Sequence, residues 1–373
     1  MNIVYFGSMR IGRPNGPGLN ERDFVEDLDT RRGVKCYIYA PIEAGVDLKL
    51  NNTVVIRNVF GVPLIREIHA IILLGLDIFR KRVRPDLVVF RVGQLPAVQC
   101  LLVVICNAFG VATHIKTIGV GICRLSQKRG VLNRANLFLL KFILSRVTSL
   151  DTPTKFARRE IIEVFQIPAS KVILIGNGAK EIALEPGSGD SSGRLCFGYV
   201  GRFPCVRGGR QVVESVSRAL DFGLQAEGLI TGDDNEISEL KLLVKSLNIE
   251  DRIEFVGIVP QDQVAGLLGR IDIGFSIMEG VEGAAGQKLR QYLMHGCCAV
   301  FLNDEFMDAV DEEFILPFVS VEKLIDEILL ADWQTRVINR ESIHQWALRN
   351  VSYRNFNSQR VQHFLDLGAT PHR

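Results

Sequence analysis

Apolar strand-like segments alternate with helix-like segments along almost the whole of this chain. The clearest example is 273–303, where the apolar segment 273–277 is followed by small residues, a helical segment 287–295 and a second apolar segment, 298–302. Gly296 closes the helical segment, because glycine readily adopts the conformation that ends a helix. Strands joined by helices pair in parallel, since a parallel pair needs a long crossover connection. The alternation therefore predicts an α/β fold built on doubly wound parallel sheets.

The same alternation predicts the individual elements. Expected strands cover 2–6, 35–40, 53–57, 87–90, 111–115, 147–150, 171–175, 195–200, 226–231, 253–255, 273–277 and 298–302. Expected helices begin near Asn20 and then cover 66–83, 95–109, 134–146, 153–165, 211–222, 236–247, 261–268, 287–295, 321–331, 341–350 and 356–367. The helix over 66–83 is predicted from the helical spacing of Ile68, Ile71, Ile72, Leu76 and Phe79.

The length of the chain indicates more than one folded core. Its 373 residues exceed what a single hydrophobic core usually supports. Segment 185–194, EPGSGDSSGR, has the composition of a linker, and the strand–helix alternation restarts after it. We therefore predict an N-terminal Rossmann-like domain over 1–180, a linker over 181–194, a C-terminal Rossmann-like domain over 195–350 and a C-terminal helix over 351–373.

Composition narrows the class of protein. A net charge of +2 gives no general affinity for nucleic acid. The eight cysteines form no CxxC pair and no metal-ligand spacing, which is typical of reduced core cysteines in a cytoplasmic protein. The first residues, MNIVYFG, read as a strand and not as a signal peptide. Segment 95–112 is the most membrane-like, but its polar residues favour a buried crossover helix and strand.

Arginines follow the strand that opens the second domain. Arg202 and Arg207 come after the strand end and just before a helix, among several glycines. Two guanidinium groups in that position can hold a diphosphate through paired hydrogen bonds, and glycines let the backbone approach it. The alternative is a pair of solvated loop arginines. The turn 283–286 is a second candidate anion site, because a helix N-terminus follows it; an ordinary strand-to-helix turn is the alternative there.

Four segments resemble the motifs of family-4 glycosyltransferases, and they follow one another along the chain in the same order as the family's motifs. GRFPCVRGG at 201–209 resembles the family's GR-(L/F)-xxx-KG signature, with Arg207 in place of the lysine. KVILIGNG at 171–178 is similar to the interdomain element KVxVIPNG, without the aspartate that usually follows. IEFVGIV at 253–259 resembles the VxFxGxV strand, and QKLRQYLMHG at 287–296 resembles the KxxEYMAxG helix. The resemblance is weakest before Arg84.

The resemblance implies a GT-B fold of two facing Rossmann-like domains, with the C-terminal helix expected to cross back to the N-terminal domain. It implies a retaining glycosyltransferase that moves a sugar from a nucleotide-diphosphate sugar, without metal or cofactor, to a glycan or lipid-linked acceptor. The acceptor is expected on the N-terminal domain near 12–18. The expected catalytic residues are Arg202, Arg207 and Glu282. The expected donor-binding residues are Gly16, Gly201, Gly257, Ile258, Glu279, Gly283, Gly286, Lys288 and Gln291.

The chain departs from the family's pattern at three places. The helix residue that contacts the donor ribose is acidic in the family and is Gln291 here. The family's first acidic position falls on Gly283, with Glu279 and Glu282 close by. A common His-Asp pair aligns with 118–119, which is Ile-Gly, while His114 is predicted to lie within a strand. Two alternatives therefore stay open: a catalytically degenerate GT-B subunit that binds a partner, and a GT-B sugar-nucleotide epimerase.

Two other motifs are assigned to structure. Asp27 and Asp29 mimic a metal-binding DxD, but residues two apart on a helix do not share a face, so we predict solvated surface. The loop 7–18 lacks GxGxxG, and the second strand ends at Ala40 with no acidic residue for a nicotinamide ribose, which argues against a dehydrogenase.

The segment 116–150 contains lysines and arginines but no acidic residue. It includes the apolar stretch 137–143, flanked by Arg134 and Arg146. One interpretation is a crossover helix with solvated basic residues. The other is peripheral contact with anionic lipid at the cytoplasmic face of a membrane, which presents the N-terminal domain to a lipid-linked acceptor.

Overall fold

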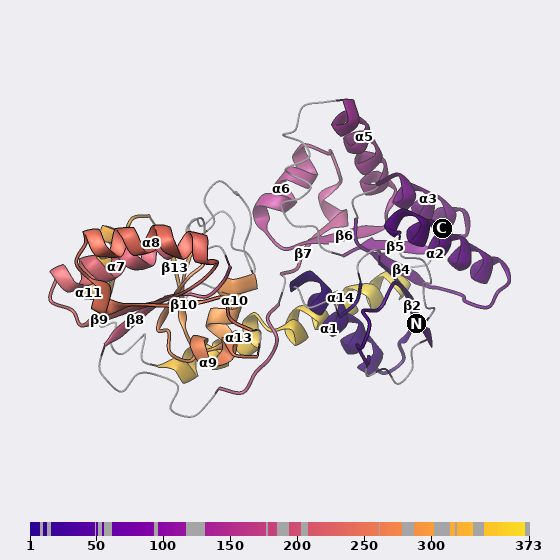
Figure 1. Cartoon of the computed structure of the whole chain (residues 1–373). Coiled ribbons are helices and arrows are strands. Elements are labelled where there is room, and N and C mark those ends of the chain that lie inside the picture. Colours follow the sequence, from indigo (N-terminus) through magenta and orange to yellow (C-terminus); the bar gives the residue numbers. More distant parts are fainter. Residues whose placement is uncertain are drawn as a thin grey trace. The chain divides into compact units, whose positions relative to one another are not determined.

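The structure, a computed structural model, forms two compact units. It describes residues 1–7, 10–12, 16–48, 50, 54–55, 62–92, 96–116, 131–176, 178–184, 194–202, 208–260, 262–277, 287–301, 314–317, 319–330 and 339–369. Unit 1 consists of Met1–Asn177 and Phe356–Arg373, and unit 2 consists of Gly178–Asn355. Each unit contains its own β-sheet with helices on both faces (Figure 1).

Unit 1 contains a seven-stranded sheet in the order β3-β2-β1-β4-β5-β6-β7. All of the strand pairs are parallel. The order reverses between β1 and β4. β1 pairs with β2 on one side and with β4 on the other, so Ile3 is level with both Cys36 of β2 and Leu87 of β4. The strands are β1 (Asn2–Phe6), β2 (Lys35–Tyr39), β3 (Val54–Val55), β4 (Leu87–Phe90), β5 (Ala112–Ile115), β6 (Ser149–Thr152) and β7 (Val172–Leu174).

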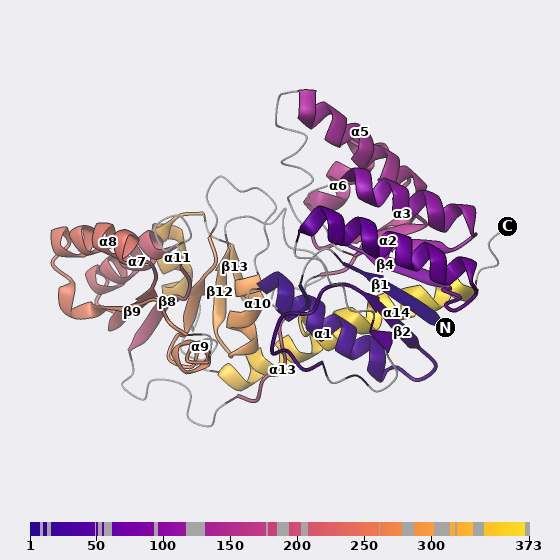
Figure 2. The same cartoon turned by 45° about the vertical axis from the view of Figure 1, so that its right-hand side comes forward.

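Helices cover both faces of this sheet. Successive strand residues point to opposite faces, so Val4 and Phe6 belong to one apolar cluster, while Ile3 and Tyr5 belong to the other. The first cluster lies beneath α2 (Pro63–Phe79), α3 (Pro96–Ala108), α5 (Val131–Arg146) and α6 (Lys155–Glu163), and a 3₁₀ turn, Ala169–Lys171, leads into β7. The second lies beneath α1 (Gly16–Thr30) and α14 (Tyr353–Ala369). Thus the end of the chain helps to form the core that holds its beginning (Figure 2).

Unit 2 repeats this plan with a six-stranded sheet in the order β10-β9-β8-β11-β12-β13. Its strands are β8 (Leu195–Tyr199), β9 (Ala226–Thr231), β10 (Ile253–Gly257), β11 (Ile273–Phe275), β12 (Cys298–Phe301) and β13 (Ile315–Pro317). Its helices are α7 (Gly209–Asp221), α8 (Asp234–Ser246), α9 (Val264–Leu268), α10 (Gln287–Met294), α11 (Val321–Leu330) and α13 (Arg340–Asn350), with a 3₁₀ turn at Glu250–Arg252. α7 packs beside α8 and α11, and α10 packs beneath α13.

The predicted α/β class with doubly wound parallel sheets is confirmed. β13 and the two 3₁₀ turns were not predicted, and the other differences are at element ends. α1 begins at Gly16, ahead of the predicted start near Asn20, because proline and glycine are tolerated in a first helical turn, whose N–H groups have no partner within the helix. β6 begins at Ser149, two residues after the predicted start at 147.

Two sequence interpretations are corrected by burial. Asp29 is 1% exposed, so the prediction that the Asp27–Asp29 pair is solvated surface is wrong for Asp29. Asp27 is half-buried and pairs with Arg31 at 3.1 Å. The helix predicted over 66–83 is present as α2, but the five apolar residues that predicted it do not form one buried face. Ile71 is buried, whereas Ile68, Ile72, Leu76 and Phe79 are exposed.

Within the residues that the structure describes, no helix is both long and apolar enough to span a bilayer.

Candidate functional site

The candidate site lies at the carboxyl edge of the unit 2 sheet, where the strand order reverses between β8 and β11. Loops leave neighbouring strands toward opposite faces at such a point and leave a crevice, which is where doubly wound sheets bind ligands. The loop after β8 holds Gly201 and Arg202, and α10 enters from the β11 side with Lys288 in its first turn. The topology therefore brings two cationic side chains to this crevice from different parts of the chain.

Lys288 lies directly across the end of β8. Its Nζ donates a hydrogen bond to the Tyr199 Oη at 2.7 Å and lies 4.1 Å from the centre of the same ring. An alanine methyl at Gly201 would lie 1.6 Å from that Nζ, so a side chain at this position would displace the lysine from where it lies. The lysine is half-buried and held in a fixed place beside a bare stretch of backbone. Such an arrangement suits an anionic ligand that needs both a cation and close backbone approach.

The loop after β8 is tied to the loop after β9. The Gly201 N–H donates to the Thr231 Oγ1 at 2.7 Å, and the Asp233 N–H donates to the Arg202 carbonyl at 2.9 Å. The Arg202 guanidinium is 66% exposed and lies 3.8 Å from the Asp233 carboxylate. The backbone of this arginine is therefore fixed, while its side chain projects into solvent with a loose carboxylate neighbour and remains accessible to a ligand.

Two helix N-termini face the same edge. α7 begins after Gly208, whose φ of 118° lies in the left-handed region and which provides no side-chain cap for the first N–H groups. A methyl at Gly208 would lie 3.0 Å from the Cβ of Phe275 on β11. α10 begins at Gln287 on the other side of the reversal point. Helix N-termini carry partial positive charge, so both add to the attraction for an anion.

The structure groups some of the predicted site residues and separates others. Gly201, Arg202 and Lys288 come together at the β8 end, and Gln291 is half-buried one turn further along α10. Gly257 ends β10 with a φ of 76° and its carbonyl accepts from the Gly232 N–H at 2.9 Å. The remaining residues are Ile258, exposed beside Gly257; Gly16, the first residue of α1 in unit 1; and Arg207, Glu279, Glu282, Gly283 and Gly286, which lie outside the described residues.

Sequence reasoning missed three supporting residues. Tyr199 and Tyr292 are buried, and the Tyr292 hydroxyl accepts from the Val200 N–H at 3.0 Å. Burial raises the pKa of Tyr292, so its hydroxyl stays protonated. Thr231, the last residue of β9, accepts from Gly201. A polar residue at the last position of a buried strand is the signal that identifies Thr231; the two tyrosines resemble ordinary core residues in the sequence.

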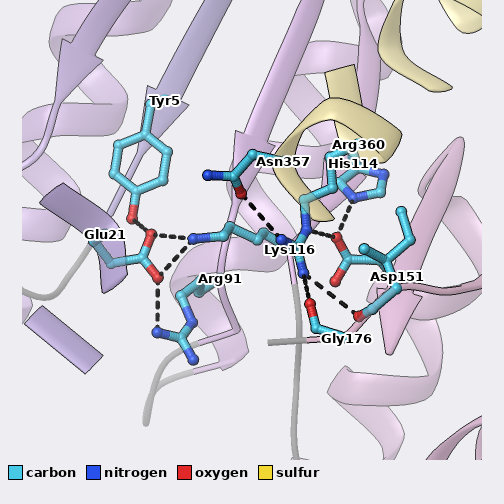
Figure 3. A network of polar contacts seen from close by, with 10 residues as sticks. Tyr5, Glu21, Arg91, His114, Lys116, Asp151, Gly176, Asn357 and Arg360 are labelled. Atoms are coloured by element: carbon cyan, nitrogen blue, oxygen red, sulfur yellow. Dashed lines mark hydrogen bonds and ion pairs between the residues drawn. The ribbon is translucent and has the colours of Figure 1, made fainter. Parts of the chain in front are cut away.

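Unit 1 carries a buried charged cluster at the equivalent edge of its own sheet (Figure 3). Glu21 of α1 accepts hydrogen bonds from Tyr5 on β1, from Arg91 after β4 at 2.8 Å and from Lys116 after β5 at 3.2 Å. Burial alone would raise the pKa of Glu21, but Lys116 and Arg91 outweigh it and hold the pKa below its usual value. Burial lowers the pKa of Lys116 to about 8, although Glu21 opposes that shift. The cluster lies at the strand reversal of unit 1, between β1 and β4.

A second buried network adjoins this cluster (Figure 3). His114 lies within β5, as predicted, with its two ring nitrogens 2.8 Å from the Ser149 hydroxyl and 3.3 Å from the Asp151 carboxylate. Arg360 of α14 donates to Asp151 at 2.7 Å and to the Gly176 carbonyl at 2.9 Å. These contacts join the last helix to β6 and to the end of β7. We read His114 as part of this structural network.

No group of three or more His, Cys, Asp or Glu side chains suited to a metal ion occurs among the residues that the structure describes. Metal independence stays a prediction.

The comparisons with known proteins agree on the fold. No family model matches the chain. A glycosyltransferase from Rickettsia africae superimposes with a TM-score of 0.66 at 14% identity, covering 99% of this chain and 98% of that one. An Anabaena protein in complex with UDP superimposes with a TM-score of 0.66 at 13% identity, covering 98% and 100%. These similarities identify the predicted GT-B fold, the fold of a large class of glycosyltransferases.

One curated relative is similar in sequence over a shorter region. The 2-deoxystreptamine glucosyltransferase of Streptomyces kanamyceticus is 27% identical over 110 residues. The match covers 27% of this chain and 28% of the length of that relative.

Proposed function

We propose that this chain is a retaining glycosyltransferase of family 4, which uses a nucleotide-diphosphate sugar as its donor. The observation that carries the proposal is the group of Gly201, Arg202 and Lys288 at the strand reversal of a GT-B sheet, with an uncapped helix N-terminus beside it. Cationic side chains and a helix N-terminus on one sheet edge suit the binding of a diphosphate.

The proposed chemistry follows from where charge develops. Cleavage of the sugar–phosphate bond gives an oxocarbenium-like sugar and a departing diphosphate that gains negative charge. Arg202 and Lys288, with the N-terminus of α7, stabilise that charge, and we assign the same role to Arg207. Because these groups are cationic, the reaction needs no metal ion. Glu282 and Glu279 are the proposed acidic residues toward the sugar, and Gln291 toward the ribose.

The comparisons indicate which donor to test first. The Anabaena protein was solved with UDP, with UDP and glucose, and with UDP-glucose, and the curated relative is named a glucosyltransferase. UDP-glucose is therefore the first donor to offer this chain. For the acceptor we propose a glycan or a lipid-linked molecule bound by unit 1, in the cytoplasm or at the cytoplasmic face of a membrane. The Glu21–Lys116–Arg91 cluster supports this, because it places polar groups at the ligand-binding edge of the unit 1 sheet.

The main alternative is a GT-B subunit that binds a nucleotide sugar but transfers little. It is favoured by Gln291, because a neutral amide offers one acceptor oxygen where a carboxylate offers two. Labelled UDP-glucose with purified protein separates the alternatives: sugar transfer or hydrolysis identifies a transferase, a changed sugar without any acceptor identifies an epimerase, and binding without turnover identifies the degenerate subunit.

The site itself is tested by Arg202→Ala. We expect kcat to fall by about 10²–10³-fold, the loss typical of removing one charge-stabilising group, while the melting temperature stays unchanged because the side chain is exposed. Arg270→Ala is the matched control: Arg270 is a half-exposed arginine paired with Glu254, and it precedes β11 at the opposite edge of the same sheet. Equal activity in both variants and the wild type would remove Arg202 from the donor site.

A further inference from the structure

The outer face of α2 is apolar along its whole length. Among the described side chains of α2 six are exposed, and all six are leucine, isoleucine or phenylalanine: Leu64, Ile65, Ile68, Ile72, Leu76 and Phe79. Ile72 is 52% exposed and Phe79 is 73% exposed. The charged residues Arg66 and Glu67 of the same helix are buried. α2 thus differs from a surface helix of a soluble protein, which faces solvent with polar side chains.

The apolar surface continues onto the neighbouring helices. α2 packs beside α3, and α3 packs beside α5, on one face of the unit 1 sheet (Figure 2). Leu101 and Val104 of α3 are exposed, and so is Phe109 just beyond its end. Phe138 of α5 is 72% exposed. We call this surface, made by the exposed apolar residues of α2, α3 and α5, the apolar face. An apolar patch that spans several elements marks an interaction site, whereas single exposed apolar residues do not.

Basic residues border the apolar face. Four exposed basic residues follow the last residue of α2: Arg80, Lys81, Arg82 and Arg84. Three more are exposed on α5: Arg134, Lys141 and Arg146. α2 and α3 both run opposite to the parallel strands, so Phe79, Phe109 and the basic residues after α2 gather at one end of the helix layer.

Acidic groups do not balance these charges. Within the described parts of α2, α3 and α5 no carboxylate has an exposed side chain: Glu67 is buried, and Asp77 is half-buried, accepts from the Tyr39 hydroxyl at 2.8 Å and lies 4.0 Å from Arg82. Asp86, which follows this region, accepts from the Asn2 N–H at 2.6 Å. The rim of the apolar face is therefore positively charged.

We propose that the apolar face of unit 1 binds the surface of an anionic lipid bilayer. Isoleucine, leucine and phenylalanine side chains enter the boundary between headgroups and acyl chains, and the basic rim contacts the anionic headgroups. The face includes α5 from the acid-free segment 116–150, but its main part is α2 and α3. The sequence predicted α2 only as a helix and α3 as a buried crossover helix. Membrane binding does not depend on transferase activity, so each can fail without the other.

The charge of the rim favours a bilayer, and not a second copy of this chain, as the partner of the apolar face. A two-fold contact through the apolar face would bring two positively charged rims together. Among the described residues of α2, α3 and α5 no exposed carboxylate is available to pair them, and the exposed Asp86 beyond α2 already accepts from the Asn2 N–H. Like charges at a contact are unfavourable. An anionic bilayer supplies the missing negative charge. A bilayer also accepts an apolar surface without requiring shape complementarity.

The test is co-sedimentation of the full chain with vesicles made of equal parts phosphatidylglycerol and phosphatidylcholine, at low and at high salt. We expect binding at low salt, weaker binding at high salt, and little binding to phosphatidylcholine alone. Ile72→Glu should weaken binding by roughly tenfold or more, because a charge is costly at that depth. Leu242→Glu is the matched control, since Leu242 of α8 is exposed as well, at 72% against 52% for Ile72, and has no exposed apolar neighbours on its helix.

A second arm isolates the charge. Removing Arg80 and Arg82 by substitution with glutamine should weaken binding by about fivefold for each charge and reduce its dependence on salt. Circular dichroism melting of each variant excludes unfolding as the cause. Absence of binding to the anionic vesicles at low salt would overturn the proposal. So would a wild-type dimer, seen by analytical ultracentrifugation, that Ile72→Glu converts to a monomer, because the face would then belong to a second copy.

Discussion

α3 in unit 1 and α10 in unit 2 occupy the same place in their sheets, yet their surroundings differ. Each helix follows the strand beyond the reversal point, β4 or β11, and leads to the next strand, β5 or β12. From Lys288 to Met294, every side chain of α10 is buried or half-buried, and the helix lies beneath α13. On α3, Leu101 and Val104 are exposed. One topology thus gives a covered helix layer in unit 2 and an uncovered one in unit 1.

The helices near the end of the chain account for the difference. α13 covers α10 in unit 2, where Arg340 donates to the carbonyls of Leu268, Ile271 and His295 at 2.9–3.0 Å. α14 joins the opposite face of the unit 1 sheet, where Arg360 binds Asp151 and Gly176. The two buried arginines act alike, but they hold their helices on faces that are not equivalent. The face of unit 1 that corresponds to the α13 side therefore keeps its apolar residues exposed in the described chain.

The largest expected effect comes from removing Arg360, which holds α14 on the sheet of unit 1. Arg360→Ala leaves the Asp151 carboxylate buried with His114 and without its guanidinium partner. We expect the free energy of unfolding to fall by about 3–5 kcal/mol, because an unpaired buried charge is strongly destabilising. Urea titration followed by circular dichroism measures the loss, and limited proteolysis should cut α14 before α13.

The control for this experiment is Arg270→Ala, which removes a solvent-exposed pair with Glu254 and should cost about 0–1 kcal/mol. If Arg360→Ala were as mild as this control, α14 would be held by its apolar contacts alone, and the parallel between the two arginines would not stand.

The fold was predictable because its signal is repeated. Each strand is a short apolar segment ended by a loop, so the order of elements and the α/β class follow from many independent segments. The position of Gly201 and Arg202 at a strand end was predictable for the same reason. The partner of a buried charge was not: Glu21, Arg91 and Lys116 are far apart in the chain, and only the strand order brings them together.

The sequence also could not predict which side of α2 faces the core, because this helix has apolar residues on all sides. Around α2, Ile71 and Leu74 face the core while Ile68 and Ile72 face outward, and all four are aliphatic. Periodicity finds a helix from such a pattern, but it assigns the buried side only when the other side is polar.

A smaller effect is expected on α2, where a buried and an exposed aliphatic residue can be compared. Leu74 is fully buried and Ile72 is 52% exposed, two residues apart on one helix. Leu74→Ala should lower the free energy of unfolding by about 3 kcal/mol through the cavity that it leaves. Ile72→Ala should change it by at most about 0.5 kcal/mol, as expected for a surface substitution. Urea titration of both variants decides, and equal losses would show that Ile72 is covered in solution by the rest of the chain or by a second copy.

The smallest expected effect concerns one histidine in each unit. Burial lowers the pKa of His295 to about 4, helped by Arg340, and burial lowers the pKa of His363 to about 4, helped by His114. In the unfolded chain both imidazoles titrate near the usual value of about 6.5. Between these values the unfolded state binds more protons than the native state. The contribution of each neutral histidine to stability is therefore present above about pH 6.5 and is lost as the pH falls toward about 4.

The prediction is that His295→Gln and His363→Gln each reduce the fall of the melting temperature between about pH 7 and about pH 5, by about 3–6 °C. The double variant should show the sum, because the two residues lie in different units and have no shared partner among their described contacts. Differential scanning calorimetry at several pH values measures the slopes. If only His363→Gln changed the slope, the His295 imidazole would be protonated in the folded state despite its burial beside Arg340, and the end of α10 would be more open to solvent than its cover by α13 implies. If only His295→Gln changed the slope, the His363 imidazole would be protonated in the folded state, and the contact between α14 and β6 would be more open to solvent than its burial implies.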